Sequence, residues 1–561
     1  MIDTRDNGLR QRPGWSEAVA HPVRSFHTLR HLQAKQVVYR AIRCTQPAGA
    51  HATIAEQPFL LPRRPSLPVD APPAFDGRGF SFLNRRFMFD GNDRWHPRGA
   101  DDLWIFNVHY FRFLTALDPS VAVELVTDWL DMNTDRRSAA WHAYPISQRV
   151  REWIEWLLAH PQTDDALRAA AMRSLAEQVE SLRRRLEFDV MGNHLLENAI
   201  TLCWAGLSFA GRHSDVWLAE GREILSHELR TQLLADGSHQ ERSPMYQALL
   251  TEALLRLAEV AARSPKSDAR TVHHLAFGDG QRLLRSLAHL VHPDGGYALV
   301  NDSAFGVAPS FSALVRRFGL ESGSAHRRSA WAPGASGYVG YADSTNGYLL
   351  FDGGPVGPDH QAGHGHADTL SFELSARGSR VLTDTGVFTY ATGGARQHDR
   401  STAAHNTIEI DGRDQAELWG AFRCARRVTT DPVVAATTRD GATIVGSYRG
   451  PGQTGPVAHR RSVAIQGRVV AFSDDVSASG SHRAVVRLHF APEIEVRRTA
   501  THWTFGERGG RPLGVLVSPL EWSAATSPYH PEFGREIERP CLYAPVTFRH
   551  QIALKWWLML R

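Results

Sequence analysis

Two histidines separated by one glycine are the first feature of this sequence that could carry chemistry. His364 and His366 lie in the stretch AGHGHADTLSFEL, just before a segment that alternates like a β-strand. Because a two-residue step along an extended chain returns to the same face, both imidazoles could point into one pocket. Imidazole binds metal ions and transfers protons near neutral pH, so one interpretation is a metal ligand beside a catalytic group.

Two further residues could complete a metal site with the second of these histidines. Asp384 lies in RVLTDTGVF and His405 in RSTAAHNTIEI, so His366, Asp384 and His405 offer the mixed nitrogen and oxygen ligands that zinc accepts. The spacings are long, and 28 histidines in the chain make chance pairs common. Histidines hydrogen-bonded inside a core or an interface are therefore an equal alternative.

Polar residues also gather at one end of the apolar segment GNHLLENAITLCWAGLSFAG. On a helix Asn193 faces Glu197, and His194 neighbours Glu197, while the rest of the segment is apolar on nearly all sides. This pattern predicts an inner, buried helix whose polar end is either functional or internally hydrogen-bonded.

A tyrosine in the segment DGSHQERSPMYQALLTEALLRL could transfer a proton. Ser243 is a good N-cap and Pro244 suits the first helical position, so Tyr246 falls in the first turn of a helix. The positive end of the helix dipole would modestly favour its phenolate. With Asn193 and His194 it supplies the groups for proton abstraction next to a carboxylate, and the alternative is an aromatic residue packed at a domain interface.

The elements that must position these residues change character along the chain. From about residue 100 to 320 apolar residues recur at three- and four-residue steps, and after about 335 the period is two, with turn residues between short strands. We therefore expect a helical or extended segment over 1–95, an all-α domain over 96–330 and an antiparallel β-sandwich over 331–561.

An ordered series of motifs resembles the heparinase II/III-like family of polysaccharide lyases. The series is LWIFNVHYFRFL, AYPISQRVREWI, GNHLLENAITL, DGSHQERSPMYQALL, GYALVNDSAFG, GHGHADTLSFEL and RSTAAHNTIEIDGRDQAE, from about residue 100 to 420. The resemblance implies an incomplete (α/α) toroid followed by an antiparallel β-sandwich. It also implies β-elimination at a uronic acid, in which the C5 proton leaves and the bond to O4 breaks.

The resemblance also implies roles for individual residues. Asn193 matches the group that neutralises the uronate carboxylate, and Tyr246 matches the base or acid that serves C5 and O4. The remaining catalytic candidates are His194, His364 and Glu197, and the metal candidates His366, Asp384 and His405 match a structural zinc site. Weaker candidates for gripping an acidic polysaccharide are Arg149, Arg242, His109 and Tyr110.

Composition limits the partners of the chain. With a net charge of +4 and no dense Lys/Arg run among its 561 residues, the chain suits an acidic saccharide rather than a nucleic acid. No apolar run is long enough to span a bilayer, and the polar N-terminus lacks the core of a signal peptide. These features predict a cytoplasmic protein, with periplasmic action and the oligomeric state left open.

Three functions remain open from the sequence. The first is a lyase for a uronic-acid polysaccharide, including an exopolysaccharide. The second is a uronyl C5-epimerase, which would use the same proton abstraction but return the proton to C5. The third is a non-catalytic glycan-binding protein that keeps the same fold.

Overall fold

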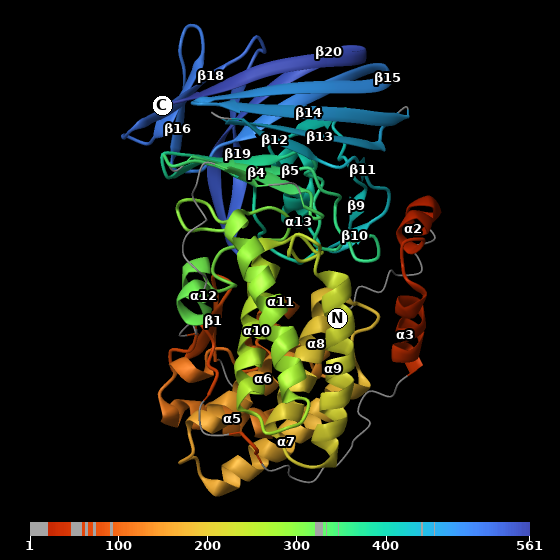
Figure 1. Cartoon of the computed structure of the whole chain (residues 1–561), viewed down its shortest axis with the longest axis vertical. Helices are drawn as coiled ribbons and strands as arrows, with labels where there is room; N and C mark the ends of the chain where they lie inside the picture. The colour runs from red at the N-terminus through yellow and green to blue at the C-terminus, as the bar shows by residue number, and fades with distance from the viewer. Residues whose placement is uncertain are drawn as a thin grey trace.

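Helices and strands occupy separate halves of the molecule. The computed structural model describes residues 21–45, 59–61, 65–70, 74–89, 94–319, 329–331, 334–345, 347–438, 441–453 and 455–561. Figure 1 shows long helices in the lower half and β-sheets in the upper half, with short elements such as α13 (Gly394–Arg400) where the halves meet. The incomplete (α/α) toroid followed by an antiparallel β-sandwich is confirmed.

The helical half is built as two layers of helices. Inner helices are buried along nearly their whole length, and outer helices bury one side only, because their sequences place charged residues on the other side. The segment GNHLLENAITLCWAGLSFAG, predicted to be an inner helix, is one of the inner helices. The inner helices are α6 (Ala143–Ala159), α8 (Gly192–Ser208) and α10 (Pro244–Arg263), and the outer ones are α5 (Pro119–Met132), α7 (Asp165–Arg184), α9 (Arg212–Gln232) and α11 (Ala269–Leu287).

Two antiparallel sheets form the upper half and share one hydrophobic core. The five-stranded sheet has the order β3-β4-β5-β6-β7 and faces a larger sheet in which β13, β14, β15 and β20 are neighbours. Phe372 of the smaller sheet packs on Phe472 of the larger one, with ring centroids 4.6 Å apart. The strands named are β3 (Ser329–Trp331), β4 (Tyr338–Ala342), β5 (Tyr348–Asp352), β6 (Phe372–Ala376), β7 (Ser379–Leu382), β13 (Gly441–Pro451), β14 (Pro456–Gln466), β15 (Val469–His489) and β20 (Arg535–Leu560).

Among the described residues no helix is both long and apolar enough to cross a bilayer.

Smaller elements complete the fold. The other elements are the helices α4 (Asp102–Tyr110) and α12 (Phe311–Phe318) and the strands β1 (Gly79–Phe82), β2 (Arg85–Met88), β8 (Ile408–Ile410), β9 (Leu418–Trp419), β10 (Arg423–Cys424), β11 (Thr429–Thr430), β12 (Val434–Thr438), β16 (Ile494–Arg498), β17 (Trp503–Glu507), β18 (Pro512–Val517) and β19 (Ser523–Glu532).

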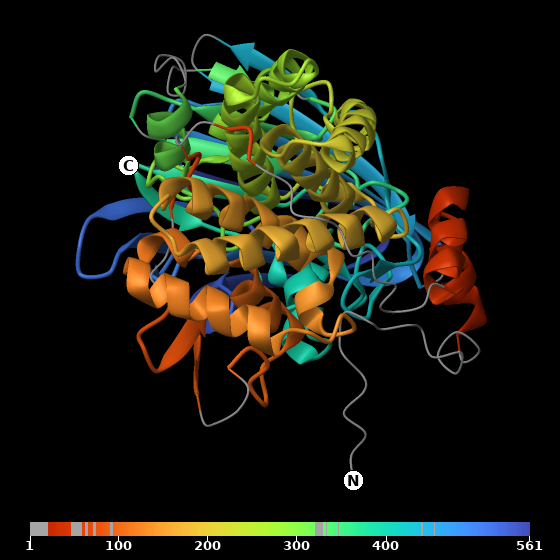
Figure 2. The same ribbon diagram turned by 90° about the horizontal axis from the view of Figure 1, so that it is seen from below.

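An arm of two helices near the N-terminus stands outside the layers. It consists of α2 (Pro22–Leu29) and α3 (Ala34–Thr45), and both views place it along the flank of the molecule (Figures 1 and 2). Trp419 Nε1 donates to Thr28 Oγ1 over 3.1 Å, and the Tyr39 ring lies 4.5 Å from that of Phe188. The arm therefore contacts both the β-half and the helical half.

Candidate active site

The predicted catalytic residues meet where the helix ends face the five-stranded sheet. Asn193 and His194 begin α8, Tyr246 lies in the first turn of α10, and His364 lies in the loop between β5 and β6. Residues far apart in the sequence thus form one contact network, which runs from Tyr246 through His364 and Glu241 to Asn193.

Tyr246 lies against His364 and a second tyrosine. The predicted N-cap is present, because Ser243 Oγ accepts a hydrogen bond from the Tyr246 N–H over 3.2 Å. The phenol oxygen is 2.9 Å from Tyr390 Oη, and the Tyr246 ring centroid is 4.4 Å from that of His364. Burial raises the pKa of Tyr246 well above 10, which corrects the expectation that the helix dipole favours its phenolate.

His364 is oriented by a buried carboxylate. Its Nδ1 lies 2.8 Å from Asp302 Oδ2, so an N–H at Nδ1 can donate to that oxygen and leave a lone pair on Nε2. Nε2 is 3.9 Å from Glu241 Oε2. The arrangement of imidazole and carboxylate is the one that holds a histidine base in the correct tautomer in other enzymes.

Asp302 joins the two histidines of the opening motif. While Oδ2 faces His364, Oδ1 lies 3.0 Å from His366 Nε2, and Arg396 donates to both oxygens from the other side. Burial alone would raise the pKa of Asp302, but the Arg396 charge and the histidine hydrogen bonds hold it well below 3.8. Asp302 is therefore a fixed anion between the two imidazoles.

The segment that carries the two histidines is a loop rather than the extended chain expected from its sequence. Strand β6 begins only at Phe372, and residues 362–371 turn back on themselves. A Cβ on Gly365 would lie 1.7 Å from the Val356 carbonyl oxygen, so only glycine fits between the histidines. The rings converge because both reach one carboxylate, not because they share a strand face.

Asn193 is held by Glu241 at the start of α8. Its backbone N–H donates to Glu241 Oε1 over 2.8 Å and its side-chain Nδ2 donates to Oε2 over 2.7 Å. A Cβ on Gly192 would lie 2.1 Å from Glu241 Oε1, and the residue has a φ of +57°, so this approach requires glycine. The second Nδ2 hydrogen remains available to a bound carboxylate.

His194 pairs with a carboxylate of its own. Its Nδ1 is 3.0 Å from Glu187 Oε1, and its ring centroid is 4.5 Å from that of Tyr144. Burial would lower the pKa of His194, but Glu187 raises it above the ordinary value. The Glu187 pKa is lowered to about 2, since His194 and other cations outweigh the effect of burial.

Glu197 lies beneath this cluster in an ion pair. Its Oε2 is 2.6 Å from Arg151 Nη2, and both side chains are only 3% exposed. Because the arginine occupies this oxygen, the contribution of Glu197 is to anchor α8 on α6 rather than to meet a ligand.

The four candidates for binding substrate divide into two groups. Tyr110 lies beside Tyr144, with ring centroids 5.8 Å apart, and so adjoins the site. Arg242 donates to the Ser336 and Gln240 carbonyl oxygens and links the helical half to the loop before β4. These two residues lie within reach of the site, and Arg242 is largely occupied.

His109 and Arg149 are removed from the substrate-binding candidates. Neither is exposed, and Arg149 donates to Gln178 and to the carbonyl oxygens of His109 and Ala140. His109 Nδ1 accepts from Trp129 Nε1 over 3.1 Å. Both residues are hydrogen-bonded inside the toroid. They therefore belong to the core and do not face a substrate.

The metal candidates do come together in the β-half. One ligand atom from each of His366, Asp384 and His405 lies within 4.8 Å of the others, and all three residues are buried. Two imidazole nitrogens, His366 Nδ1 and His405 Nε2, have no hydrogen-bond partner among the described residues. Orphaned imidazole nitrogens beside a carboxylate fit a zinc ion.

Several residues of the site carry no signal strong enough to be found in the sequence. Asp302 and Glu241 occur inside motifs that were recognised, NDSAFG and SHQERSP, but isolated carboxylates are common and their partners are distant in the chain. The other members identified only from the structure are Glu187, Tyr144, Tyr390 and Arg396.

Comparison of the sequence with known families and proteins gives consistent matches. The family model described as heparinase II/III N-terminus matches residues 119–311, and the one described as heparinase II/III-like, C-terminal, matches residues 325–542. A heparin-sulfate lyase of Pedobacter heparinus is 24% identical over an alignment of 318 positions, which covers 51% of this chain and 47% of that protein. One of Bacteroides stercoris is 23% identical over an alignment of 361 positions, which covers 57% of this chain and 48% of that protein. The chain spans about half the length of these curated relatives.

Solved structures show the same fold over the whole chain. The crystal structure of heparinase III superposes with a TM-score of 0.70 at 15% identity and covers 98% of this chain and 92% of its own. Heparan sulfate lyase HepC from Pedobacter heparinus has a TM-score of 0.57 at 17% identity and covers 99% and 92%. At these sequence identities the structural similarity shows the fold alone.

Proposed function

We propose that this chain, which belongs to the heparinase II/III-like family, is a lyase that cleaves a uronic-acid polysaccharide by β-elimination. The observation that carries the proposal is the contact of Tyr246 with His364, whose Nδ1 faces Asp302 at 2.8 Å. Two proton-transferring groups thus lie side by side, within the same network as an amide that can bind a carboxylate. The relatives named as heparin-sulfate lyases support the same class of reaction.

The residues divide the reaction between them. The free N–H of the Asn193 amide and the His194 imidazolium bind the uronate carboxylate and stabilise the charge that spreads onto it when C5 loses its proton. His364 Nε2, which keeps its lone pair, takes that proton, and the electrons of the C5–H bond form the C4=C5 double bond. The C4–O4 bond breaks, and O4 keeps its electron pair and receives a proton from the Tyr246 phenol.

Burial suits Tyr246 to the second of these steps. A phenol whose pKa is raised well above 10 is fully protonated at neutral pH and can donate to O4 as that oxygen leaves. The hydrogen bond between the two phenols, 2.9 Å long, can orient the Tyr246 hydroxyl.

His366, Asp384 and His405 are proposed to hold a structural zinc. A bound zinc would supply a rigid crosslink between the loop before β6, the segment after β7 and the segment before β8. His366 Nε2 faces Asp302, so its Nδ1 is the nitrogen left for the metal. Through Asp302, the position of His366 fixes that of His364.

The reaction is tested by incubating the protein with a panel of uronic-acid polymers and following the ultraviolet absorbance of the unsaturated product. Each polymer is paired with its carboxyl-reduced form, which lacks the carboxylate that acidifies C5. Absorbance that grows only with the acidic form supports the lyase. Solvent deuterium entering C5 without chain cleavage would mean an epimerase, and binding without either change would mean a glycan-binding protein.

A further inference from the structure

We propose that the cavity beneath the N-terminal arm is a binding subsite for an anionic group, a carboxylate or sulfate ester, of an acidic saccharide. The proposal rests on the proposed function for the identity of the saccharide. The cavity lies next to the catalytic cluster but does not contain it. The sugar bound there would therefore be one distant from the bond that breaks.

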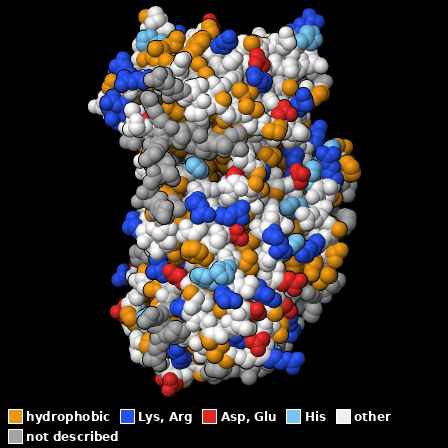
Figure 3. Space-filling model, in the orientation of Figure 1, with side chains coloured by type: hydrophobic (Ala, Val, Ile, Leu, Met, Phe, Trp, Pro, Cys, Tyr) orange, Lys and Arg blue, Asp and Glu red, His pale blue; other side chains and the backbone are white. Residues whose placement is uncertain are grey.

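The cavity lies between the arm and the end of α7. It has a volume of about 160 Å³, which exceeds the space that one ordered water needs. Figure 3 shows Lys and Arg side chains on the right flank of the molecule, at the height at which Figure 1 draws α3. The lining residues are Tyr39, Ile42, Arg43, Arg183, Arg184, Arg185, Leu186 and Phe188.

Cations outnumber anions around this cavity. Arg43 pairs with Asp189 over 3.0 Å, and Glu180 accepts from both Arg183 and Arg184. Arg183 also pairs with Glu220, and Lys35 lies over the Phe188 ring. Three carboxylates therefore face five cations, the four lining arginines and Lys35. Guanidinium groups bind carboxylates and sulfates through paired, charge-assisted hydrogen bonds.

Aromatic rings form the apolar part of the same cavity. The rings of Tyr39 and Phe188 have centroids 4.5 Å apart and contribute from the arm and from the helical half. A pocket with apolar walls and a few convergent charged groups is typical of small-ligand sites, and the hydrocarbon face of a sugar ring suits such walls.

One loop connects the cavity to the catalytic cluster. Phe188 lines the cavity, while its neighbour Glu187 pairs with His194 over 3.0 Å. The Arg43 charge also acts on both members of that pair, since it helps to lower the pKa of Glu187 and opposes the rise in the pKa of His194. A saccharide bound at His194 therefore has this cavity as its next cationic contact on the arm side.

The arm is held in place by both halves of the molecule. In addition to the contact between Thr28 and Trp419, Gln36 Nε2 donates to the His360 carbonyl oxygen over 3.2 Å, four residues before His364. The arm thus spans from the loop that carries a catalytic histidine to the end of α7, and Arg43 is positioned rather than free in solvent.

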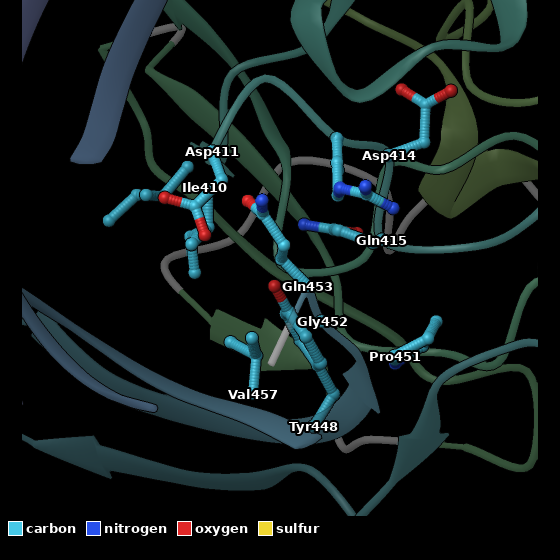
Figure 4. A pocket seen from close by; sticks show the side chains of 11 residues that line it. Ile410, Asp411, Asp414, Gln415, Tyr448, Pro451, Gly452, Gln453 and Val457 are labelled. Atoms are coloured by element: carbon cyan, nitrogen blue, oxygen red, sulfur yellow. The ribbon is translucent and has the colours of Figure 1, made fainter. Parts of the chain in front are cut away.

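A second cavity in the β-half does not compete for this role. It lies between the turn after β8 and the β13–β14 connection, where Figure 4 shows Asp411, Gln415 and Gln453 around it. Its volume of about 20 Å³ is room for roughly one water molecule, so a sugar residue does not fit.

The subsite is tested by binding rather than turnover. The full chain carrying Tyr246→Phe is titrated with a labelled uronate oligosaccharide, and the dissociation constant is compared with that after adding Arg43→Gln or Arg184→Gln. Loss of one charge-assisted contact should weaken binding about tenfold. Arg497→Gln on β16, an arginine 70% exposed outside the cavity, is the matched control and should stay within about twofold.

The outcomes separate the subsite from the reaction. Turnover by the wild-type chain with unchanged binding in both arginine variants would overturn the subsite and leave the lyase standing. Weakened binding in both arginine variants, together with no turnover by the wild-type chain, would support the subsite and overturn the lyase. Weakening seen only with a sulfated oligosaccharide assigns the sulfate as the bound group, and weakening with the unsulfated one assigns the carboxylate.

Discussion

His364 and His366 bind opposite oxygens of the Asp302 carboxylate, at 2.8 Å and 3.0 Å. The first histidine contacts Tyr246 and the second contributes to the candidate zinc site. One buried anion thus links the two sites and fixes the orientation of both rings.

Replacing Asp302 by asparagine should inactivate the enzyme. The amide keeps the size of the side chain, but its NH2 group cannot accept the His364 N–H, and the Arg396 charge loses its partner. By analogy with other histidine–aspartate pairs we expect turnover to fall by about 10³–10⁴-fold. Steady-state kinetics with thermal melts will check this, and a variant with wild-type turnover would mean that Asp302 does not orient His364.

The proposed zinc site predicts different phenotypes for the two histidines. His366→Ala should lower metal content and melting temperature together, because a metal bound only by the folded state stabilises it. His364→Ala should abolish turnover and leave the metal content unchanged. Elemental analysis beside thermal melts distinguishes them, and wild-type protein purified in zinc-containing medium without stoichiometric metal would contradict the site.

Asn193→Ala should reduce turnover, because the variant lacks the amide that stabilises the transition state. Loss of a donor to the developing charge typically costs about 2.7–4 kcal/mol, which is a factor of about 10²–10³ in kcat. Alanine keeps the backbone N–H that donates to Glu241 Oε1 but removes the Nδ2 donor to Oε2, so folding is checked by circular dichroism. A change confined to KM would show that Asn193 only holds the substrate.

The ion pair of Glu187 and His194 should stabilise the folded protein most within a limited range of pH. The lowered pKa of Glu187, from 4.5 to about 2, means that its contribution is complete above pH 4.5 and is lost as the pH falls toward 2. The raised pKa of His194 means that its contribution is complete below pH 6.5 and is lost as the pH rises through its folded value.

Glu187→Gln measures this window directly. The difference in unfolding free energy between wild type and variant should be largest between about pH 4.5 and 6.5 and should shrink on both sides. Urea unfolding across this range checks it. A difference that does not change with pH would show that the two residues contribute through packing and not through their charges.

Sequence patterns predict the architecture well because they report local physics. The change of period from helical to alternating places the helices and strands, and turn residues such as Arg377 and Gly378, with φ of 53° and 89°, lie at the tight turn expected between β6 and β7. The short helix α13 was not expected, because GARQHDR is too short and polar to show a period.

The site was predictable only where a residue belongs to a recognised motif. The metal candidates and Tyr246 converge as expected, whereas Asp302, Glu241 and Glu187 act through partners 7 to 94 residues away that no local pattern reveals. Burial also cannot be read from residue type, and so Arg149 was a candidate for binding an acidic polysaccharide although it lies in the core.

The most direct test of the account is the turnover of Tyr246→Phe. Phenylalanine keeps the ring that contacts His364 but removes the hydroxyl that donates to O4, whereas Tyr390→Phe as control removes only the partner of that hydroxyl. The rate of unsaturated product formation from a uronic-acid polymer is measured for each. We predict that Tyr246→Phe forms no product while it binds polymer like wild type, and that Tyr390→Phe remains active. Product formation by Tyr246→Phe at the wild-type rate would contradict the account.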